Sequence, residues 1–293
     1  MTAVVDFHTH TLASDGALTP AALLARASAA GVAMLAVTDH DTVDGYRQIC
    51  DSASASGVAL VSGVELSSQW SGVGVHVVGL GFDANAPSLV DGIAFLQAAR
   101  AGRAEEIASR LEKRGFTGAL AGAIACAGTS QIGRPHFARW MVDAGHVPDL
   151  GAAFDRYLGR GKIGDVKACW PTLASVTGWL AEAGGIAVLA HPLQYRLTRM
   201  KLRRLLTDFR AAGGRGLEIL SGRQEAAQTG AMARLAADFN LYASVGSDFH
   251  RDSPYGPSLG VESRVMADVP NVVDVLQARA GGPSSGTVPG NPG

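Results

Sequence analysis

The chain has 293 residues and is 47% hydrophobic, enough to fill one barrel-sized core or two ordinary domains. Its 25 basic and 26 acidic residues leave a net charge of −1, which argues against a nucleic-acid scaffold, stable DNA binding or a membrane-surface protein. No apolar stretch approaches the roughly 20 residues of a membrane span, and the N-terminus lacks a signal-peptide pattern. Its three cysteines, Cys50, Cys126 and Cys169, match no metal-binding spacing, so we expect a cytoplasmic protein with reduced thiols.

The first third of the chain alternates short apolar runs with helical patterns. Four strands are predicted there, at 3–7, 34–37, 60–64 and 73–80. One helix is expected to begin at the cap Thr19-Pro20 and end at Gly31, and another to span 42–56. This alternation predicts a parallel α/β fold.

The middle of the chain contains helical patterns without a convincing strand. They cover 89–114, 118–127, 135–144, 150–158 and 173–183. Strands then return at 186–190, 217–220 and 242–245, with helices at 198–212, 224–239 and 271–280. We interpret 101–180 as a helical insertion, a substrate lid on a barrel built from 1–100 and 181–280. The Gly-, Pro- and Ser-rich stretch 281–293 is expected to be a disordered tail.

Histidine and carboxylate motifs accompany the predicted strands, most of them at the carboxyl ends. They are His8-Thr9-His10, Ser14-Asp15-Gly16, Asp39-His40-Asp41, Glu65, His76, His191-Pro192 and Asp248-Phe249-His250. About seven such strands predict an α/β barrel, whose catalytic residues collect at that end. Residues two apart on a strand share a face, so each His or Asp pair with this spacing can grip one ion. Nine candidate ligands are too many for one ion and suit two or three.

Each of these residues also has a plainer explanation when considered alone. His76, among valines, would usually be a hydrogen-bonded core residue, and His191 and Asp15 would be turn residues. Only their joint occurrence in this order favours a metal centre. Imidazole suits zinc, manganese or iron, so ligand type does not separate these metals.

The motifs, in this order, resemble those of the PHP (polymerase and histidinol phosphatase) family over about residues 1–100 and 180–260. The resemblance implies a distorted (β/α)7 TIM-like barrel and a phosphoesterase centre with two or three divalent ions. Manganese is the metal that it suggests first, with iron or zinc as alternatives.

The resemblance also implies a role for each ligand. The first ion would be held by His8, His10, Glu65 and Asp248. Glu65 would bridge to a second ion held by His76 and His191, and a third ion would be held by Asp15, His40 and His250. Glu65, Asp248 and His191 are therefore also the predicted catalytic residues, around a metal-bridging hydroxide that attacks phosphorus in line.

The insertion contains a candidate phosphate-binding motif, Gly133-Arg134-Pro135-His136. Pro135 can open a helix, which would leave Arg134 and His136 near its N-terminus, and Arg134 can grip a phosphate with two nitrogens. A large insertion with Arg-Pro-His resembles the branch of 3′,5′-nucleoside bisphosphate phosphatases and 5′→3′ exoribonucleases. Lys162, Lys167 and Arg196 are further candidates for a second phosphate.

The predicted function is therefore hydrolysis of the 3′-phosphate of nucleoside bisphosphates, for example adenosine 3′,5′-bisphosphate to AMP, and of short RNA from the 5′ end. A small-metabolite phosphatase, such as a histidinol-phosphate phosphatase, is the nearest alternative and would not need the insertion. A metal-dependent nucleotide-binding protein without turnover is the alternative from another class. The oligomeric state stays open.

Overall fold

The computed structural model describes residues 3–166, 170–254 and 256–280. Lys167 and Cys169, and the predicted tail at 281–293, lie outside these ranges. The described chain forms an eight-stranded, barrel-shaped sheet in the order β7-β6-β5-β4-β3-β2-β1-β8. The strands are β1 (Val4–Asp6), β2 (Val32–Val37), β3 (Ala59–Trp70), β4 (Val73–Leu80), β5 (Ile186–Leu189), β6 (Gly216–Ser221), β7 (Tyr242–Gly246) and β8 (Val261–Glu262).

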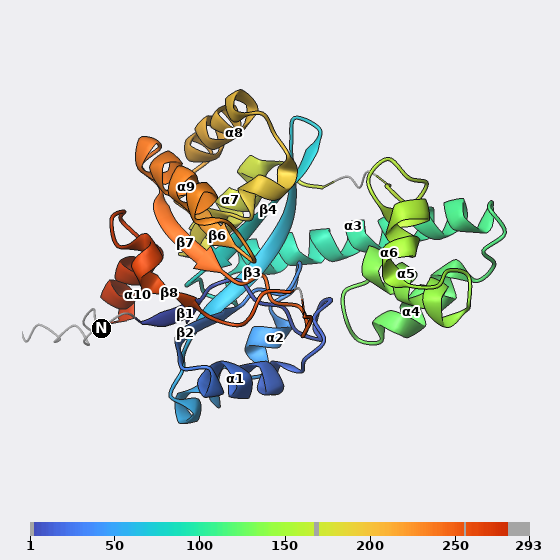
Figure 1. Cartoon of the computed structure of the whole chain (residues 1–293), viewed down its shortest axis with the longest axis horizontal. Coiled ribbons are helices and arrows are strands. Elements are labelled where there is room, and N and C mark those ends of the chain that lie inside the picture. Colours follow the sequence, from blue (N-terminus) through green and yellow to red (C-terminus); the bar gives the residue numbers. More distant parts are fainter. Residues whose placement is uncertain (1–2, 167–169, 255, 281–293) are drawn as a thin grey trace, which may run out of the picture.

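The sheet comes close to closing on itself. The Phe7 amide, just after β1, donates a hydrogen bond of 3.1 Å to the Val245 carbonyl oxygen of β7, and Thr9 pairs with Phe249 beyond both strands. The short strand β8, which the sequence did not predict, adds to the start of β1 in antiparallel orientation. The predicted distorted barrel with a helical insertion is thus confirmed (Figure 1).

The expectation of a parallel sheet is wrong for β4, which runs antiparallel to both β3 and β5. β3 continues well past Val64 to Trp70 and turns directly into β4 through Ser71 and Gly72. Both turn residues have positive φ angles, 47° and 75°, as a two-residue hairpin turn requires. Because no helix separates the two strands, the chain must reverse at this point.

The predicted helix at 42–56 is also wrong. Only α2 (Asp44–Arg47) is α-helical there, and a 3₁₀ turn, η1 (Ala53–Ser56), follows it. The Ser52 hydroxyl donates to the Ile49 carbonyl and the Ser56 hydroxyl to the Ala53 carbonyl. Such local side-chain bonds to the backbone compete with a continuous helix.

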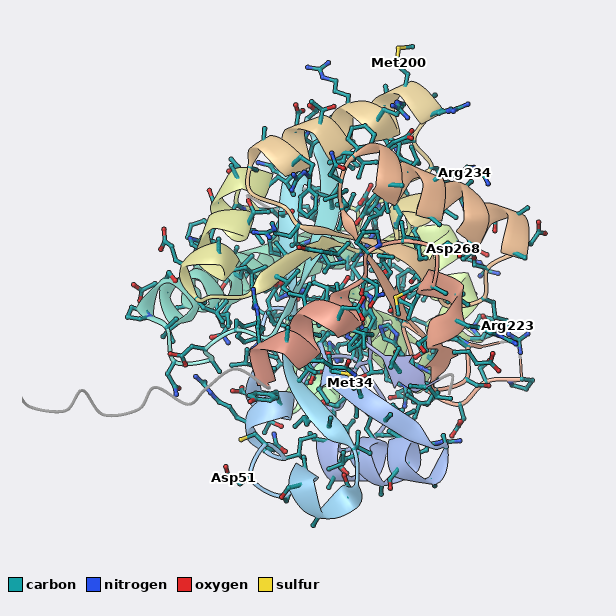
Figure 2. All side chains as sticks on the ribbon, turned by 90° about the vertical axis from the view of Figure 1, so that its left-hand side faces the viewer. Met34, Asp51, Met200, Arg223, Arg234 and Asp268 are labelled. Atoms are coloured by element: carbon teal, nitrogen blue, oxygen red, sulfur yellow. The ribbon has the colours of Figure 1, made fainter. Side chains whose placement is uncertain are left out.

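Helices cover the outside of the sheet (Figures 1 and 2). They are α1 (Pro20–Ala29), α7 (Leu173–Glu182), α8 (Arg199–Ala211), α9 (Ala226–Asp238) and α10 (Val272–Ala280). Threonine side chains cap α1, α7 and α8 by accepting a bond from a first-turn amide. On α8 the apolar side chains Leu202, Leu205, Leu206 and Phe209 are buried, whereas Met200 projects into solvent (Figure 2).

The long helix α3 (Pro87–Glu112) connects the barrel to the helical insertion. Its first half packs on the barrel core through Leu89, Ile93 and Leu96. Its second half belongs to a separate hydrophobic cluster that includes Ile107, Leu111 and Phe137. That cluster is closed by α4 (Ala119–Ala127), α5 (Arg134–Asp143), α6 (Leu150–Ala153) and the π-helical turn η2 (Phe154–Leu158). Among the described residues, no helix is both long and apolar enough to cross a membrane.

The separate cluster predicts that the insertion can be weakened without disturbing the barrel. Phe137→Ala should lower the free energy of unfolding by about 3–5 kcal/mol, because it empties a fully buried ring site. Metal content should be unchanged. Urea unfolding monitored by circular dichroism, with metal analysis of the folded variant, measures both. Loss of metal in Phe137→Ala would show that the two cores are coupled.

Candidate metal centre

All nine predicted ligands meet at one end of the barrel. They form four overlapping groups whose ligand atoms lie within 4.8 Å of one another. The groups are His8, His10 and Asp248; His8, Glu65 and His191; His40, Glu65 and His76; and His10, Asp15, His40 and His250. The loops after β1, β2, β5 and β7 carry seven of these residues, whereas Glu65 and His76 lie within the β3–β4 hairpin.

Glu65 occupies the centre of the arrangement and is almost fully buried. Its Oε1 atom lies 2.8 Å from His76 Nδ1 and 2.8 Å from His191 Nε2. Its Oε2 atom lies 3.0 Å from His40 Nδ1, 3.2 Å from His8 Nε2 and 3.4 Å from His10 Nε2. One carboxylate therefore faces five imidazoles, with each oxygen directed to a different set, as a bridging ligand requires.

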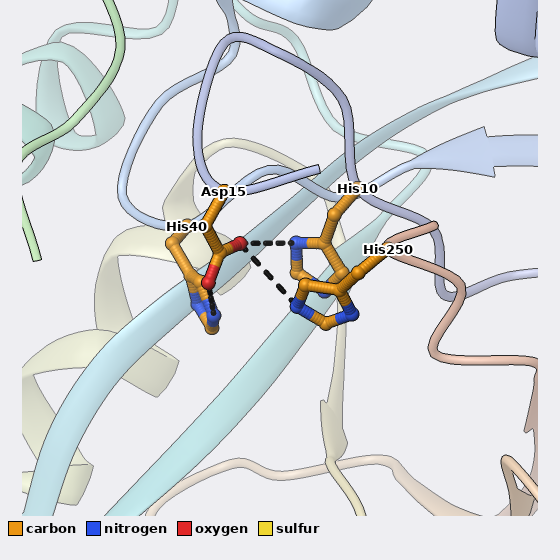
Figure 3. A group of neighbouring side chains, drawn as sticks. All are labelled: His10, Asp15, His40 and His250. Carbon is orange, nitrogen blue, oxygen red and sulfur yellow. Dashed lines mark ion pairs between the residues drawn. The ribbon is translucent and has the colours of Figure 1, made fainter. Parts of the chain in front are cut away.

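Two other carboxylates face the histidines at the edges of the site. Asp248 Oδ1 lies 3.4 Å from His10 Nε2 and 3.6 Å from His8 Nε2. Asp15 lies between three rings (Figure 3), with Oδ1 3.3 Å from His250 Nε2 and Oδ2 3.9 Å from His40 Nε2. The side chains of His10 and His250 stack at 4.1 Å between ring centroids. These distances leave room for cations between the ligand atoms.

Several buried ligand atoms lack a hydrogen-bond partner within the described chain. They are His8 Nε2, both ring nitrogens of His10, His40 Nδ1, Glu65 Oε2 and His191 Nδ1. Buried polar atoms are nearly always satisfied, so a cluster of unsatisfied atoms at one point calls for a ligand. Nitrogen and carboxylate oxygen together suit divalent manganese, iron or zinc, and the residues present therefore fit such ions.

A second layer of carboxylates, which the sequence analysis missed, holds the ligands in place. Glu218 on β6 accepts from His8 Nδ1 at 2.9 Å and from the His191 backbone amide at 2.6 Å. Fixing one ring nitrogen of His8 directs the other nitrogen to the centre. The signal in the sequence was a single acid in the apolar strand Leu217-Glu218-Ile219.

Asp39 and Asp6 organise the loops around the site. Asp39 accepts from the Thr11 amide, the Thr11 hydroxyl and the Ser14 hydroxyl, which shapes the loop that carries Asp15. Asp6 accepts from the amides of Ser247 and Gly260 at 2.8 Å each. Burial raises the pKa of Asp6 to about 6, against the effect of these bonds. Both acids therefore act through the backbone and not as ligands.

One glycine allows the close approach of β7 to the first histidine motif. A Cβ atom on Gly246 would lie 2.2 Å from His8 Cβ and 2.8 Å from the His8 amide nitrogen. Any side chain there would push β7 away from His8. Asp248, two residues further on, would move with it.

The charges within the site reinforce one another. Burial acts to raise the pKa of Glu65. The nearby His40, His8 and His76 lower it by more than burial raises it, so the pKa of Glu65 lies well below its ordinary range. Burial acts to lower the pKa of His40, yet Glu65 and Asp15 raise it to about 9. Burial, together with His250, lowers the pKa of His10 to about 3. The site therefore holds ionised carboxylates beside a neutral His10.

The four predicted substrate-binding residues occupy different environments. Arg134 begins α5, is about one-third exposed, donates to the Leu158 carbonyl at 3.1 Å and lies 3.6 Å from Asp165. His136 is buried, and its Nδ1 accepts from the Gly133 amide at 3.0 Å as part of a helix cap. Lys162 is exposed, and its side chain makes no hydrogen bond or ion pair with any described residue. Arg196 lines a pocket that also contains His191 and Asp248.

Known proteins are similar to this chain over most of its length. The PHP domain model matches residues 6–116. A 5′-3′ exoribonuclease of Haemophilus influenzae is 44% identical over 250 residues, which cover 85% of this chain and 91% of the relative. A 3′,5′-nucleoside bisphosphate phosphatase of Chromobacterium violaceum is 41% identical over 257 residues, with 87% and 90% covered. The solved structure of an amidohydrolase from C. violaceum, with bound sulfate and no metal, matches with a TM-score of 0.85 and 38% identity, covering 94% and 96%.

The geometry predicts that Asp248 is needed for metal binding. Asp248→Asn should weaken divalent-metal binding by at least about 100-fold, because a charged ligand becomes neutral next to His8 and His10. Metal content after dialysis, measured by mass spectrometry, tests this. Asp252→Asn is the matched control, since Asp252 pairs with Arg26 at the surface. Equal metal in both variants would contradict the assignment of Asp248.

The raised pKa of His40 predicts that metal binding releases protons. Below a pKa of about 9 the metal-free His40 carries a proton that an ion must displace. Metal affinity should therefore rise with pH between about 6 and 8, by about tenfold per unit for each proton released. Calorimetric titration in two buffers with different ionisation enthalpies counts these protons. If no protons were released on metal binding, and the metal affinity did not depend on pH, His40 would be excluded as a ligand.

Proposed function

Because the chain belongs to the PHP family, we propose that it is a metal-dependent phosphoesterase that hydrolyses the 3′-phosphate of 3′,5′-nucleoside bisphosphates, and short RNA from the 5′ end. The proposal of a metal-dependent reaction rests on one observation. Nine candidate ligands, with Glu65 at their centre, converge, and several of their buried atoms have no hydrogen-bond partner within the described chain. The named activities of the exoribonuclease and bisphosphate phosphatase relatives support the substrate class.

The proposed ligand sets follow the contacts around Glu65. His8, His10 and Asp248 would hold one ion with Glu65, and His76 and His191 a second. Asp15, His40 and His250 would hold a third. We propose manganese as the resident metal, with iron and zinc compatible with the same donor set.

When bound, such ions supply Lewis-acid chemistry, which makes a water nucleophilic at neutral pH and neutralises charge on phosphoryl oxygens. The residues that we propose as catalytic are Glu65, Asp248 and His191, which would hold these ions at the centre of the site. Glu218 orients His8 and fixes the His191 backbone, so the ligands need little rearrangement before reaction. The burial of Glu65, His8 and His10 keeps bulk water from the central oxygen atoms.

A pocket of about 470 Å³ opens beside His191 and Asp248, and it is large enough for a nucleotide-sized ligand. It is lined by Gln194, Arg196, Ser221, Arg223, Gln224 and Gln228 among others. Three of its non-glycine residues, His191, Arg196 and Asp248, have positive φ angles of 26°, 52° and 53°. Backbone strain of this kind concentrates at functional sites. We propose that Arg196 contacts substrate phosphate here.

The helical insertion, proposed as 101–180 on a barrel of 1–100 and 181–280, would cover the side of the site that the Asp15 loop forms. The Gln131 amide, just before α5, donates to the Ala13 carbonyl in the loop that carries Asp15. Arg134, His136 and Lys162 stay proposed substrate residues on this side, although the His136 ring already caps α5. We also propose a cytoplasmic location, which suits the free thiols of Cys50 and Cys126.

The direct test is phosphate release from adenosine 3′,5′-bisphosphate by manganese-loaded protein, with histidinol phosphate and p-nitrophenyl phosphate as competitors. We expect AMP and phosphate as products, and a kcat/KM for the bisphosphate at least about 100-fold above that for histidinol phosphate, because only the bisphosphate has a second phosphate to bind. Mononucleotide release from a 5′-phosphorylated oligoribonucleotide tests the RNA activity. A preference for histidinol phosphate would overturn the substrate assignment and leave the metal centre intact.

A further inference from the structure

The pocket beside His191 and Asp248 is separate from the helical insertion. Its walls are the ends of β5, β6 and β7 and the segments that follow them, and none of the described residues of 101–180 lines it. The insertion contacts the mouth of the barrel elsewhere, where the Gln131 amide donates to the Ala13 carbonyl in the loop after β1. The candidate metal centre therefore has a second open side, and two of its candidate ligands form part of that wall.

An RNA substrate needs such a second side. In a nucleoside 3′,5′-bisphosphate the 3′-phosphate ends the molecule, whereas in RNA one oxygen of the same phosphate carries the next nucleoside. Hydrolysis breaks the bond between phosphorus and the 3′ oxygen: the hydroxide of a water joins phosphorus, and the remaining proton leaves on the 3′ oxygen. The shortened RNA keeps the phosphate, so it must extend from the ligands along a path that the first nucleoside does not occupy.

Two arginines stand at the rim of this pocket. Arg196 and Arg223 are exposed, and neither forms an ion pair with a described residue. Within the described chain, the side chain of Arg223 makes one long hydrogen bond, 3.5 Å, to the Pro254 carbonyl. Asp248 is the one acid that lines the pocket, and we propose it as a metal ligand. Both guanidinium groups therefore keep paired donors for a phosphate.

The polar walls of the pocket are held in place by the fold. Gln194 Nε2 donates to Asp248 Oδ2 at 3.2 Å. Gln224 Nε2 donates to the Ile219 carbonyl at 2.7 Å. In contrast, Ser221 Oγ is buried and has no hydrogen-bond partner within the described chain. Buried polar atoms are nearly always satisfied, so this hydroxyl lacks a partner that a polar ligand in the pocket can supply.

We propose that this pocket holds the second nucleotide of an RNA substrate, on the 3′ side of the cleaved linkage, and that Arg196 and Arg223 contact the phosphate that follows it. A volume of about 470 Å³ suits one nucleotide. The proposal rests on the proposed function and identifies the phosphate that Arg196 contacts. A nucleoside bisphosphate has no atoms beyond its 3′-phosphate and does not reach these arginines. The pocket therefore serves the cleavage of RNA and not the hydrolysis of the free bisphosphate.

The test compares adenosine 3′,5′-bisphosphate with 5′-phosphorylated triadenylate on manganese-loaded protein. Arg223→Gln should lower kcat/KM for release of the first nucleotide by roughly 5- to 10-fold, and that for the bisphosphate by less than about twofold, because an exposed charge pair contributes modestly. Arg223→Lys should lose less, since it keeps the charge. Arg196→Asn combined with Arg223→Gln should lose about 30-fold on the triadenylate if the two contacts add. Asparagine suits position 196 because it tolerates a φ of 52°.

Arg234→Gln is the matched control. Arg234 is an exposed arginine on α9 that does not line the pocket, and Figure 2 labels it together with Arg223. It should cleave both substrates at the wild-type rate. Equal losses on both substrates in Arg223→Gln, or no loss on either, would overturn the proposal. Thermal unfolding of each variant verifies that the fold is intact.

Binding gives a second measurement that does not depend on turnover. The probe is 5′-phosphorylated triadenylate with a fluorophore at its 3′ end and a methylene group in place of the 3′ oxygen of its first linkage, which cannot be hydrolysed. Its dissociation constant, measured by fluorescence anisotropy, should rise about fivefold in Arg223→Gln and stay unchanged in Arg234→Gln. If wild-type protein released neither phosphate nor nucleotides but bound this probe through Arg223, the proposed function would fail and the subsite would stand. If it hydrolysed the bisphosphate and Arg223→Gln bound the probe as wild type does, the subsite would fail and the phosphatase function would stand.

Discussion

The buried carboxylate of Glu65 is the constraint on which the site depends. It is surrounded by five imidazoles, and its charge is stable there only because those rings, or the cations they hold, compensate for the loss of water. The β3–β4 hairpin makes this arrangement possible. Glu65 pairs with Val78 on the facing strand, and His76 lies two residues from Val78, so Glu65 and His76 point to the same face of the sheet. The antiparallel β4 therefore brings a proposed ligand, His76, to a position that the end of a parallel strand would not reach.

Acids around the ligands have a different task from the ligands themselves. Asp6, Asp39 and Glu218 accept bonds from backbone amides and side chains and keep three ligand loops in place. Asp41 does the same for Ser67 and extends the network to Arg100 on α3. The candidate metal site and the side that carries the insertion are thus linked by adjacent residues, the proposed ligand His40 and the anchor Asp41. Changes in the insertion can therefore reach the metal centre through one carboxylate.

The helix α3 connects the barrel, which carries the candidate metal ligands, to the helical insertion. Its first half is part of the barrel core and its second half part of the insertion core, so the insertion has a fixed direction relative to the site. Arg100 and Arg103 lie at the midpoint of this helix, where the two cores separate. A rigid helix holds such side chains at a constant distance from the candidate ligands, which a loop would not do as well.

The sequence by itself indicated the nine candidate ligands, most of the strand-and-helix order and a helical insertion, because each leaves a local trace in motif or periodicity. The resemblance of these motifs to a known family also indicated the chemistry. Tertiary structure alone decided the reversal of β4, the role of Glu218 and the contact between Asp41 and Arg100. Strand direction depends on pairing partners, and the role of a buried acid depends on neighbours distant in sequence: Glu218 is 210 residues from His8. No local pattern encodes such contacts, since they arise only when the barrel closes.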